Sequence, residues 1–148
     1  SVAIEGVKRP YLAPKGFRAQ RPQEPDDTMR ILGPLDPLLW DRALVREVFG
    51  FDYVWEVYKP ASERRWGWYV CPLLHRGRLV GRIEARIADG VLVVDRLWRE
   101  AGVELDEVAF DAALELHAVA CGARGVKRGR GARGVKRGRG ARRRGKRP

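Results

Sequence analysis

The spacing of apolar residues changes along this chain, and each change marks a predicted element. After Asp41 the apolar residues recur at helical spacing, and Gly50 ends the pattern. These apolar residues are Leu44, Val45, Val48 and Phe49. We therefore predict a short helix between Asp41 and Gly50, preceded by a turn that Asp36 caps at Pro37.

From residue 51 the period becomes two, which is typical of strands with one buried face. Four segments show it: residues 51–58, 66–74, 78–87 and 91–97. The connections between them are residues 59–65, Arg76-Gly77 and Asp89-Gly90, and the last favours a type I′ hairpin turn. Consecutive strands with short connections predict an antiparallel meander, curled or closed into a barrel.

Residues 106–120 return to a helical period. One stripe of this segment carries Val108, Ala112, Leu116 and Val119, and acidic residues stand early in it, where the helix dipole favours them. We expect this stripe to pack the helix against the sheet. The predicted fold class is therefore α+β: a small antiparallel four-stranded meander or barrel with flanking helices and a disordered basic C-terminal tail.

Two segments show no sustained period. Residues 1–35 are rich in Pro, Gly and charge, and we predict an extended connector ahead of a barrel-like domain at 36–121. Residues 122–148 contain a nine-residue repeat, Gly-Ala-Arg-Gly-Val-Lys-Arg-Gly-Arg, at 122–130 and again at 131–139. Because the repeat offers little apolar surface, we expect a disordered Arg/Gly-rich tail.

The basic tail is a candidate for contact with a polyanion. The candidate contact residues are Arg124, Lys127, Arg128, Arg133, Lys136 and Arg137. The alternative is that a recent repeat expansion or a shifted reading frame wrote this segment and that it does little.

The charge of the chain is unevenly divided. The tail carries 13 of the 30 Lys and Arg residues and no acidic residue, so the remainder holds 17 basic against 19 acidic groups. The net charge of +11 therefore does not by itself indicate a nucleic-acid-binding face on the folded part.

Composition also bears on location. Apolar residues make up 45% and charged residues 33% of the chain, and the longest uncharged run, 66–75, is too short to span a membrane. The chain starts at Ser1 without Met or a signal peptide, so we expect a truncated, cytoplasmic protein with no membrane partner. The excess of Arg over Lys and the absence of Asn indicate a GC-rich, bacterial genome.

Cys71 and Cys121 cannot form a disulfide framework. Each lies four positions from a histidine, His75 and His117, and the four side chains could in principle close a Cys2His2 zinc site. The alternative is a buried strand cysteine, a turn histidine and two helix-end groups that never meet. We expect no cofactor.

Five sequence blocks follow one another along the chain. They are Gly33-Pro34-Leu35-Asp36-Pro37-Leu38-Leu39-Trp40-Asp41-Arg42, Phe49-Gly50-Phe51-Asp52-Tyr53, Tyr58-Lys59-Pro60, Arg64-Arg65-Trp66-Gly67-Trp68-Tyr69-Val70 and Leu79-Val80-Gly81-Arg82. With these blocks, about residues 1–120 resemble the C-terminal third of the bacterial winged-helix DNA glycosylases of the YcaQ and AlkZ type.

This resemblance implies a cytosolic, nucleoid-associated repair enzyme that hydrolyses the N-glycosidic bond of alkylated or cross-linked bases. The catalytic motif of the family, Gln-x-Gln or Gln-x-Asp, belongs to the N-terminal part, and Gln20 and Gln23 here have the wrong spacing. We therefore carry over no catalytic residue and expect the chain alone to be an inactive, DNA-binding C-terminal portion. The alternatives are a non-catalytic DNA-binding protein, serving transcription or nucleoid association, and a degenerate fragment.

The candidate DNA-binding residues are Lys59, Arg64, Arg65 and Trp66. The three cations lie in the connection between two predicted strands, flanked by Tyr58 and Trp66, and a cationic hairpin tip of this kind suits phosphate contacts or a minor groove. We expect the partner to be double-stranded DNA and the protein to be a monomer. The alternative is a solvated turn in which Glu63 pairs with Arg64 or a neighbour.

Other residues favour structural readings. Arg78, Arg82 and Arg86 form a basic row on one strand, which we interpret as a solvated sheet face. We expect Trp55 and Trp68 in the core. The carboxylates of Asp36 and Asp41 fit helix starts better than acid and base catalysis.

Overall fold

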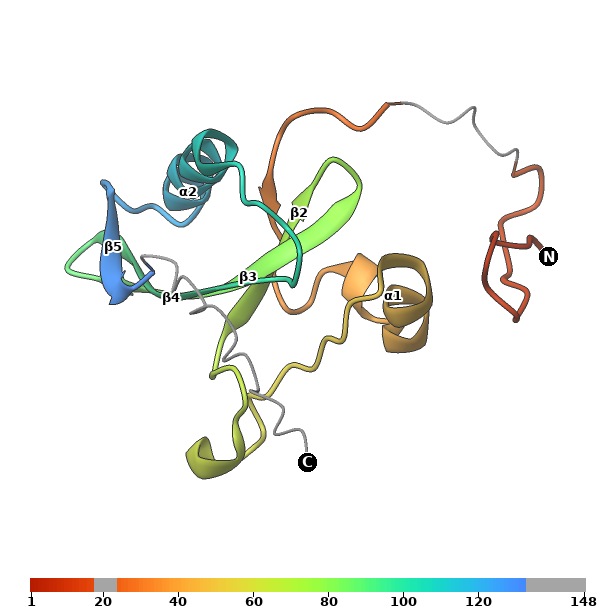
Figure 1. Cartoon of the computed structure of the whole chain (residues 1–148), viewed down its shortest axis with the longest axis horizontal. Coiled ribbons are helices and arrows are strands. Elements are labelled where there is room, and N and C mark those ends of the chain that lie inside the picture. The colour runs from red at the N-terminus through yellow and green to blue at the C-terminus, as the bar shows by residue number, and fades with distance from the viewer. Residues whose placement is uncertain (18–23, 133–148) are drawn as a thin grey trace, which may run out of the picture.

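The computed structural model describes residues 1–17 and 24–132, and its strands form one sheet in the order β1-β2-β3-β4-β5 (Figure 1). The strands are β1 (Arg30–Ile31), β2 (Val70–His75), β3 (Arg78–Ala88), β4 (Val91–Arg99) and β5 (Val126–Gly131). The helices are α1 (Arg42–Phe49) and α2 (Glu107–Ala120), with 3-10 turns η1 (Pro37–Leu39) and η2 (Ala61–Glu63). The α+β class is confirmed.

Strands β2, β3 and β4 form the antiparallel meander that the period-two pattern predicts. Two-residue turns join them, and in both turns the two residues have positive φ: 48° and 71° at Arg76-Gly77, 50° and 70° at Asp89-Gly90. Positive φ at both positions is the geometry of a type I′ turn, so the prediction for Asp89-Gly90 is confirmed.

The segment 51–58, predicted as the first strand, is not a strand. β2 has two edges; β3 pairs with one, and β1 pairs with the other through Arg30 and Ile31. The alternation in 51–58 instead turns Phe51 and Tyr53 inward, and the Tyr53 hydroxyl donates a hydrogen bond of 2.9 Å to the Val70 carbonyl. The β2 edge that a preceding strand would need is therefore occupied by β1.

Strand β5 makes the sheet mixed, because it pairs parallel to β4. The chain leaves β4, passes through α2 and returns as β5, which is the crossover that parallel strands require. The sheet is open and has five strands in the described residues. The predicted antiparallel meander is therefore confirmed only for β2–β3–β4, while the barrel alternative and the count of four all-antiparallel strands are wrong. The predicted disorder is wrong for residues 122–132; residues 133–148 of the predicted tail lie outside the described residues.

Helix α1 begins and ends where the sequence predicts. The Asp41 carboxylate accepts from the Leu44 N–H at 3.0 Å, and Gly50 closes the helix in the left-handed conformation. Asp36 caps η1 in the same way, accepting from the Leu38 N–H at 2.9 Å. Both aspartates are helix-start groups, as predicted. Asp41 also receives hydrogen bonds from Arg9 and Tyr11 of the N-terminal segment.

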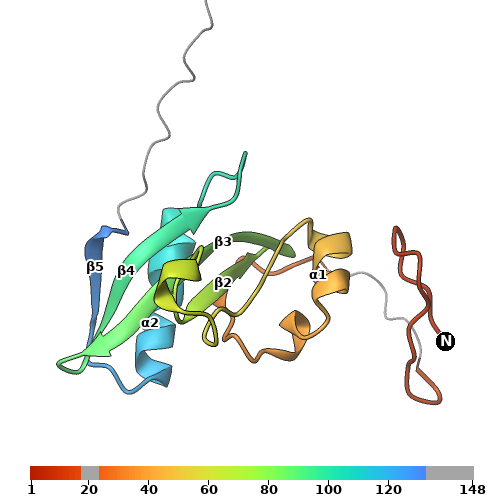
Figure 2. The ribbon, with the colours of Figure 1, turned by 90° about the horizontal axis from the view of Figure 1, so that it is seen from below.

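Two cores lie on the two faces of the sheet. The larger packs the sheet against α2, and the smaller packs it against α1, η1 and the segment that follows α1. Figure 2 shows α2 behind the sheet and η2 in front of it. The loop that contains η2 therefore stands on the face opposite α2.

Helix α2 packs through a different stripe from the predicted one. The buried residues of this helix are Phe110, Ala113, Leu114 and Ala118. The predicted stripe faces outward, with Val108 82%, Leu116 63% and Val119 75% exposed. Because apolar residues occupy both sides of this helix, its period alone could not identify the buried side.

Within the two described stretches, no helix combines the length and apolar content needed to cross a membrane.

Candidate nucleic-acid interface

The candidate DNA-contacting residues lie in one loop, residues 56–69, which we call the 56–69 loop. It connects the segment after α1 to the first residue of β2 and includes η2. Hydrogen bonds to the buried side chain of Glu56, which is 3% exposed, hold the backbone of this loop. The Glu56 carboxylate accepts hydrogen bonds from the N–H groups of Arg65, at 3.1 Å, and Trp66, at 2.7 Å.

Lys59 also binds this carboxylate, because its Nζ donates a hydrogen bond to Glu56 Oε1 at 2.9 Å. Burial acts to raise the pKa of Glu56, but the hydrogen bonds from the Trp66 N–H, the Lys59 ammonium and the Arg65 N–H outweigh it and lower the pKa to about 2. Glu56 is therefore an anion that organises the loop. The sequence pattern gives no sign of this role, since Glu56 is only a polar position within a predicted strand.

A second carboxylate holds the end of the loop. Glu84 of β3 accepts from the Trp68 N–H at 2.9 Å. Gly67 lies directly over it with φ of +154°, and a Cβ there would stand 2.2 Å from Glu84 Oε1. Only glycine fits this close approach without a shift. Two acidic side chains thus set the path of the Arg64–Tyr69 backbone, although neither appeared as a candidate in the sequence.

The structure brings the predicted cations together in the 56–69 loop. Arg65 is exposed, with its guanidinium 4.6 Å from the ring centroid of Trp66. Arg64 is half-buried, and its Nε donates to the Lys59 carbonyl at 2.9 Å. Lys59 forms its ion pair with Glu56 and not with Glu63, the partner considered in the alternative interpretation of this turn. Of the three cations, Arg65 is the most accessible to a phosphate.

Trp66, the fourth candidate, is half-buried and already has aromatic and cationic neighbours. Its ring meets Trp98 edge-on at 5.5 Å, and Arg82 lies 4.2 Å from its centroid. The Trp66 ring therefore packs against Arg65, Arg82 and Trp98, and these contacts leave it poorly placed to stack on a base.

The 56–69 loop also exposes three aromatic side chains. Tyr58 is 90% exposed, Trp68 55% and Tyr69 41%. Trp55 links them, with ring centroids 6.0 Å from Tyr58 and 6.4 Å from Tyr69. The expectation that Trp68 belongs to the core is wrong, because Gly67 turns the chain outward just before it, whereas Trp55 packs beside the smaller core. Exposed aromatic rings next to cations can stack on unpaired bases.

Arg82 departs from the predicted solvated row. It is 2% exposed, and its guanidinium lies 4.0 Å from the Phe51 ring centroid. Its Nη2 donates to Glu100 Oε1 at 2.8 Å, and its Nη1 donates to the Asp52 carbonyl at 3.0 Å. Arg82 is therefore a structural cation beneath the 56–69 loop. Arg86 is exposed and pairs with Asp95 at 2.9 Å.

The basic tail residues that the structure describes lie on or beside β5. Arg124 and Lys127 are exposed. Arg128 is bound to Glu107 and Asp111 of α2, so its charge is already partnered. The other three predicted tail contacts, Arg133, Lys136 and Arg137, lie outside the described residues, as do Gln20 and Gln23.

The four side chains considered as a possible zinc site are Cys71, His75, His117 and Cys121. Across residues 1–17 and 24–132, no three His, Cys, Asp or Glu side chains form a cluster that could hold a metal ion. His75 Nε2 instead lies 3.1 Å from the Asp27 carbonyl oxygen. Burial raises the pKa of the Cys71 thiol to about 12, which disfavours the thiolate that a metal requires.

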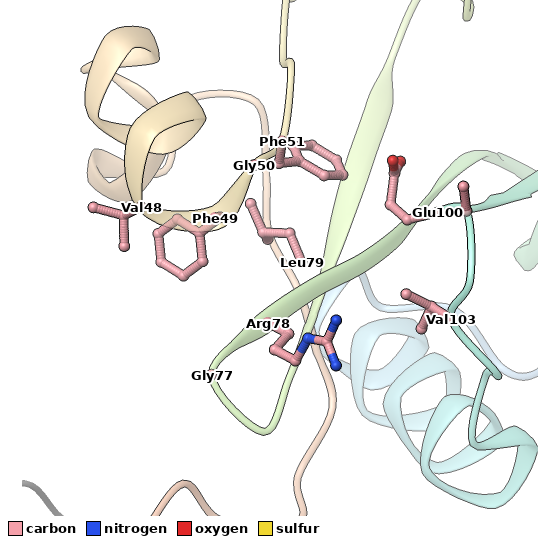
Figure 3. A pocket seen from close by; sticks show the side chains of 10 residues that line it. Val48, Phe49, Gly50, Phe51, Gly77, Arg78, Leu79, Glu100 and Val103 are labelled. Atoms are coloured by element: carbon pink, nitrogen blue, oxygen red, sulfur yellow. The ribbon is translucent and has the colours of Figure 1, made fainter. Parts of the chain in front are cut away.

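A cleft of about 330 Å³ opens between the end of α1, the β2–β3 turn and the segment after β4 (Figure 3). Phe49, Leu79 and Val103 supply apolar walls, and Arg78 and Glu100 supply charged groups. The cleft does not include Lys59, Arg64, Arg65 or Trp66, and it is separate from the 56–69 loop.

A comparison with known families identifies the kind of protein to which the chain is related. The family model DNA glycosylase AlkZ-like matches residues 1–123. The chain belongs to the AlkZ-like DNA glycosylase family. This membership confirms the resemblance and supports a role related to DNA glycosylase activity and DNA repair. The match ends before β5 begins at Val126. No solved structure matches the chain.

Proposed function

We propose that this chain is the DNA-contacting C-terminal part of a glycosylase that removes alkylated or cross-linked bases. The 56–69 loop carries the proposal: a buried anion, Glu56, orders a backbone that presents Arg65 over the ring of Trp66. The same loop exposes the rings of Tyr58 and Trp68. Exposed guanidinium groups bind phosphates, and neighbouring rings stack on bases that leave the helix. The partner is double-stranded DNA.

Arg65→Ala tests the loop in the complete chain. Loss of one phosphate contact lowers the duplex affinity and reduces the slope of log K against log salt by about one. Lys59 is unsuitable for this test, because its ammonium also supports Glu56. Fluorescence anisotropy with a labelled duplex at several salt concentrations gives both quantities.

Arg76→Ala is the control for the loss of one positive charge, since Arg76 is an exposed arginine at the β2–β3 turn, the end of β2 away from the loop, where it pairs with Asp27 at 2.7 Å. It removes the same charge and should leave the salt slope unchanged. If Arg65→Ala and Arg76→Ala have the same effect, the 56–69 loop is not the DNA interface.

The catalytic Gln-x-Gln or Gln-x-Asp motif, in this proposal, belongs to a part of the protein outside this sequence. The chain alone should therefore release no base from an alkylated duplex, measured as alkali-labile abasic sites. The full gene product should release them. Base release by the 148-residue chain would place catalytic groups within it, and no release by either would favour the non-catalytic alternative.

A further inference from the structure

The edge of β4 and the adjoining face of α2 form a groove that β5 fills, which we call the β5 groove. An arginine anchors the strand in it. Arg128 Nη1 donates to Glu107 Oε2 at 2.9 Å, its Nη2 donates to the Asp111 carboxylate, and its guanidinium lies 4.6 Å from the Phe110 ring centroid. Two acidic groups and an aromatic face thus recognise one arginine of the repeat.

The groove also restricts the size of neighbouring residues. A Cβ at Gly129 would stand 3.0 Å from the Val94 carbonyl oxygen, and one at Gly131 would stand 2.6 Å from that of Asp95. Ala132 is 1% exposed, and Val126 packs against the larger core. The groove therefore accepts the pattern Val-x-Arg-Gly-x-Gly-Ala.

The chain contains this pattern twice. Residues 126–132 read Val-Lys-Arg-Gly-Arg-Gly-Ala, and residues 135–141 read the same seven residues. Every residue that the groove selects in the first copy has its counterpart in the second, Arg137 for Arg128 and Gly140 for Gly131 among them. Both copies follow the end of the family match at residue 123.

We propose that the second copy, residues 135–141, is an alternative occupant of the β5 groove and exchanges with the first copy in the same chain. When the second copy occupies the groove, Arg137 takes the place of Arg128 between Glu107 and Asp111, and the first copy is released. The proposal concerns the sheet edge and does not depend on the proposed function.

Loop closure sets the balance between the two occupants. Five residues, 121–125, now join α2 to β5, and fourteen, 121–134, would join α2 to the second copy. With identical contacts, the longer connection disfavours the second copy by about fivefold, because closure entropy grows with the logarithm of loop length. About one molecule in six should hold the second copy.

Charge reversal of each arginine tests the exchange in the complete chain. Arg128→Glu and Arg137→Glu have the same composition and net charge, so each controls for the other. The Leu92 N–H donates to the Gly125 carbonyl at 2.9 Å, beside the groove, and its hydrogen exchange reports whether either copy is docked. Gly134 stands at the equivalent position of the second copy.

Arg137→Glu should leave the protection of the Leu92 amide unchanged. Arg128→Glu should lower it only about sixfold, because the rarer docked state remains. The double variant should lose it. If Arg128→Glu alone matches the double variant, or if the double variant matches the unsubstituted chain, the proposal is overturned.

A second pair of variants makes the result independent of charge. Gly131→Val and Gly140→Val oppose docking of the first and second copy through the close approach to the Asp95 carbonyl, and the same order of effects is expected. Size-exclusion chromatography is run on Arg128→Glu at two concentrations. A monomer supports exchange within one chain, whereas a concentration-dependent dimer would show docking between chains and overturn the proposal as stated.

Discussion

Glu56 places a buried carboxylate under the backbone of Arg65 and Trp66, and the shape of the 56–69 loop depends on it. A buried anion is stable only where donors surround it, and the Lys59 ammonium and two N–H groups do so here. At the scale of the residue, therefore, the surface cation Arg65 owes its position to a side chain that is itself hidden from solvent.

Glu56→Gln should lower the free energy of unfolding by about 2 kcal/mol, because the amide cannot accept from every donor and loses the pairing with Lys59. Urea denaturation measures this difference. Glu63→Gln is the matched control, since Glu63 is exposed on η2, and it should change stability little. Equal stabilities of the two variants would show that Glu56 does not order the loop.

The same carboxylate predicts a pH dependence. The pKa of Glu56 falls from the ordinary value of 4.5 to about 2 in the folded protein, so folding favours the ionised form. The resulting stabilisation, about 3 kcal/mol, is complete above pH 4.5 and is lost as the pH falls from 4.5 to about 2. Glu56→Gln should remove this part of the acid dependence, whereas an unchanged acid transition would contradict the assigned role.

At the scale of the element, α2 shows how one helix can carry two apolar stripes. Phe110 and Leu114 face the sheet, while Val108, Leu116 and Val119 face away from it. The inward stripe contains the Phe110 ring, and the guanidinium of Arg128 on β5 lies 4.6 Å from the centroid of that ring. The choice between the stripes follows from the partner strands and not from the helix.

Two identical substitutions on α2 separate the stripes. Leu114 is 1% exposed, and Leu114→Ala should lower the free energy of unfolding by about 2–5 kcal/mol, because it leaves a cavity in the core. Leu116 is 63% exposed, and Leu116→Ala should lower the free energy of unfolding by less than about 0.5 kcal/mol. Thermal or urea denaturation compares them, and a larger loss for Leu116→Ala would restore the orientation expected from the sequence.

At the scale of the whole molecule, the sheet separates two cores, and β5 extends the larger one beyond the family match at residue 123. Val126 and Ala132 join that core from a segment whose composition indicates disorder. The repeat thus contributes to the fold, whatever it also contacts.

Shortening the chain tests this contribution. Residues 1–123 should be less stable than the complete chain by about 2 kcal/mol, comparable to the burial of one valine side chain. Residues 1–132 should match the complete chain, because they retain β5. Urea denaturation of the three chains distinguishes the cases, and equal stability of residues 1–123 and 1–132 would mean that β5 adds nothing to the fold.

The local elements could be predicted from the amino-acid sequence. Periods and caps predicted α1 from Asp41 to Gly50, and turn residues predicted the β2–β3–β4 hairpins, because backbone preferences of this kind act over a few neighbouring residues. The grouping of Lys59, Arg64 and Arg65 followed from their proximity in one connection, and the family blocks identified the kind of protein.

Which surfaces meet could not be predicted before the complete fold was known. The short β1, and not the segment 51–58, pairs with the β2 edge, and α2 buries the stripe that contains Phe110. Part of the basic repeat forms β5, where acidic groups of α2 pair with Arg128. Glu56 and Arg82 are buried ions whose partners are distant in sequence or belong to the backbone. No local pattern encodes such partners, since a charge is stable in the interior only when the complete fold supplies them.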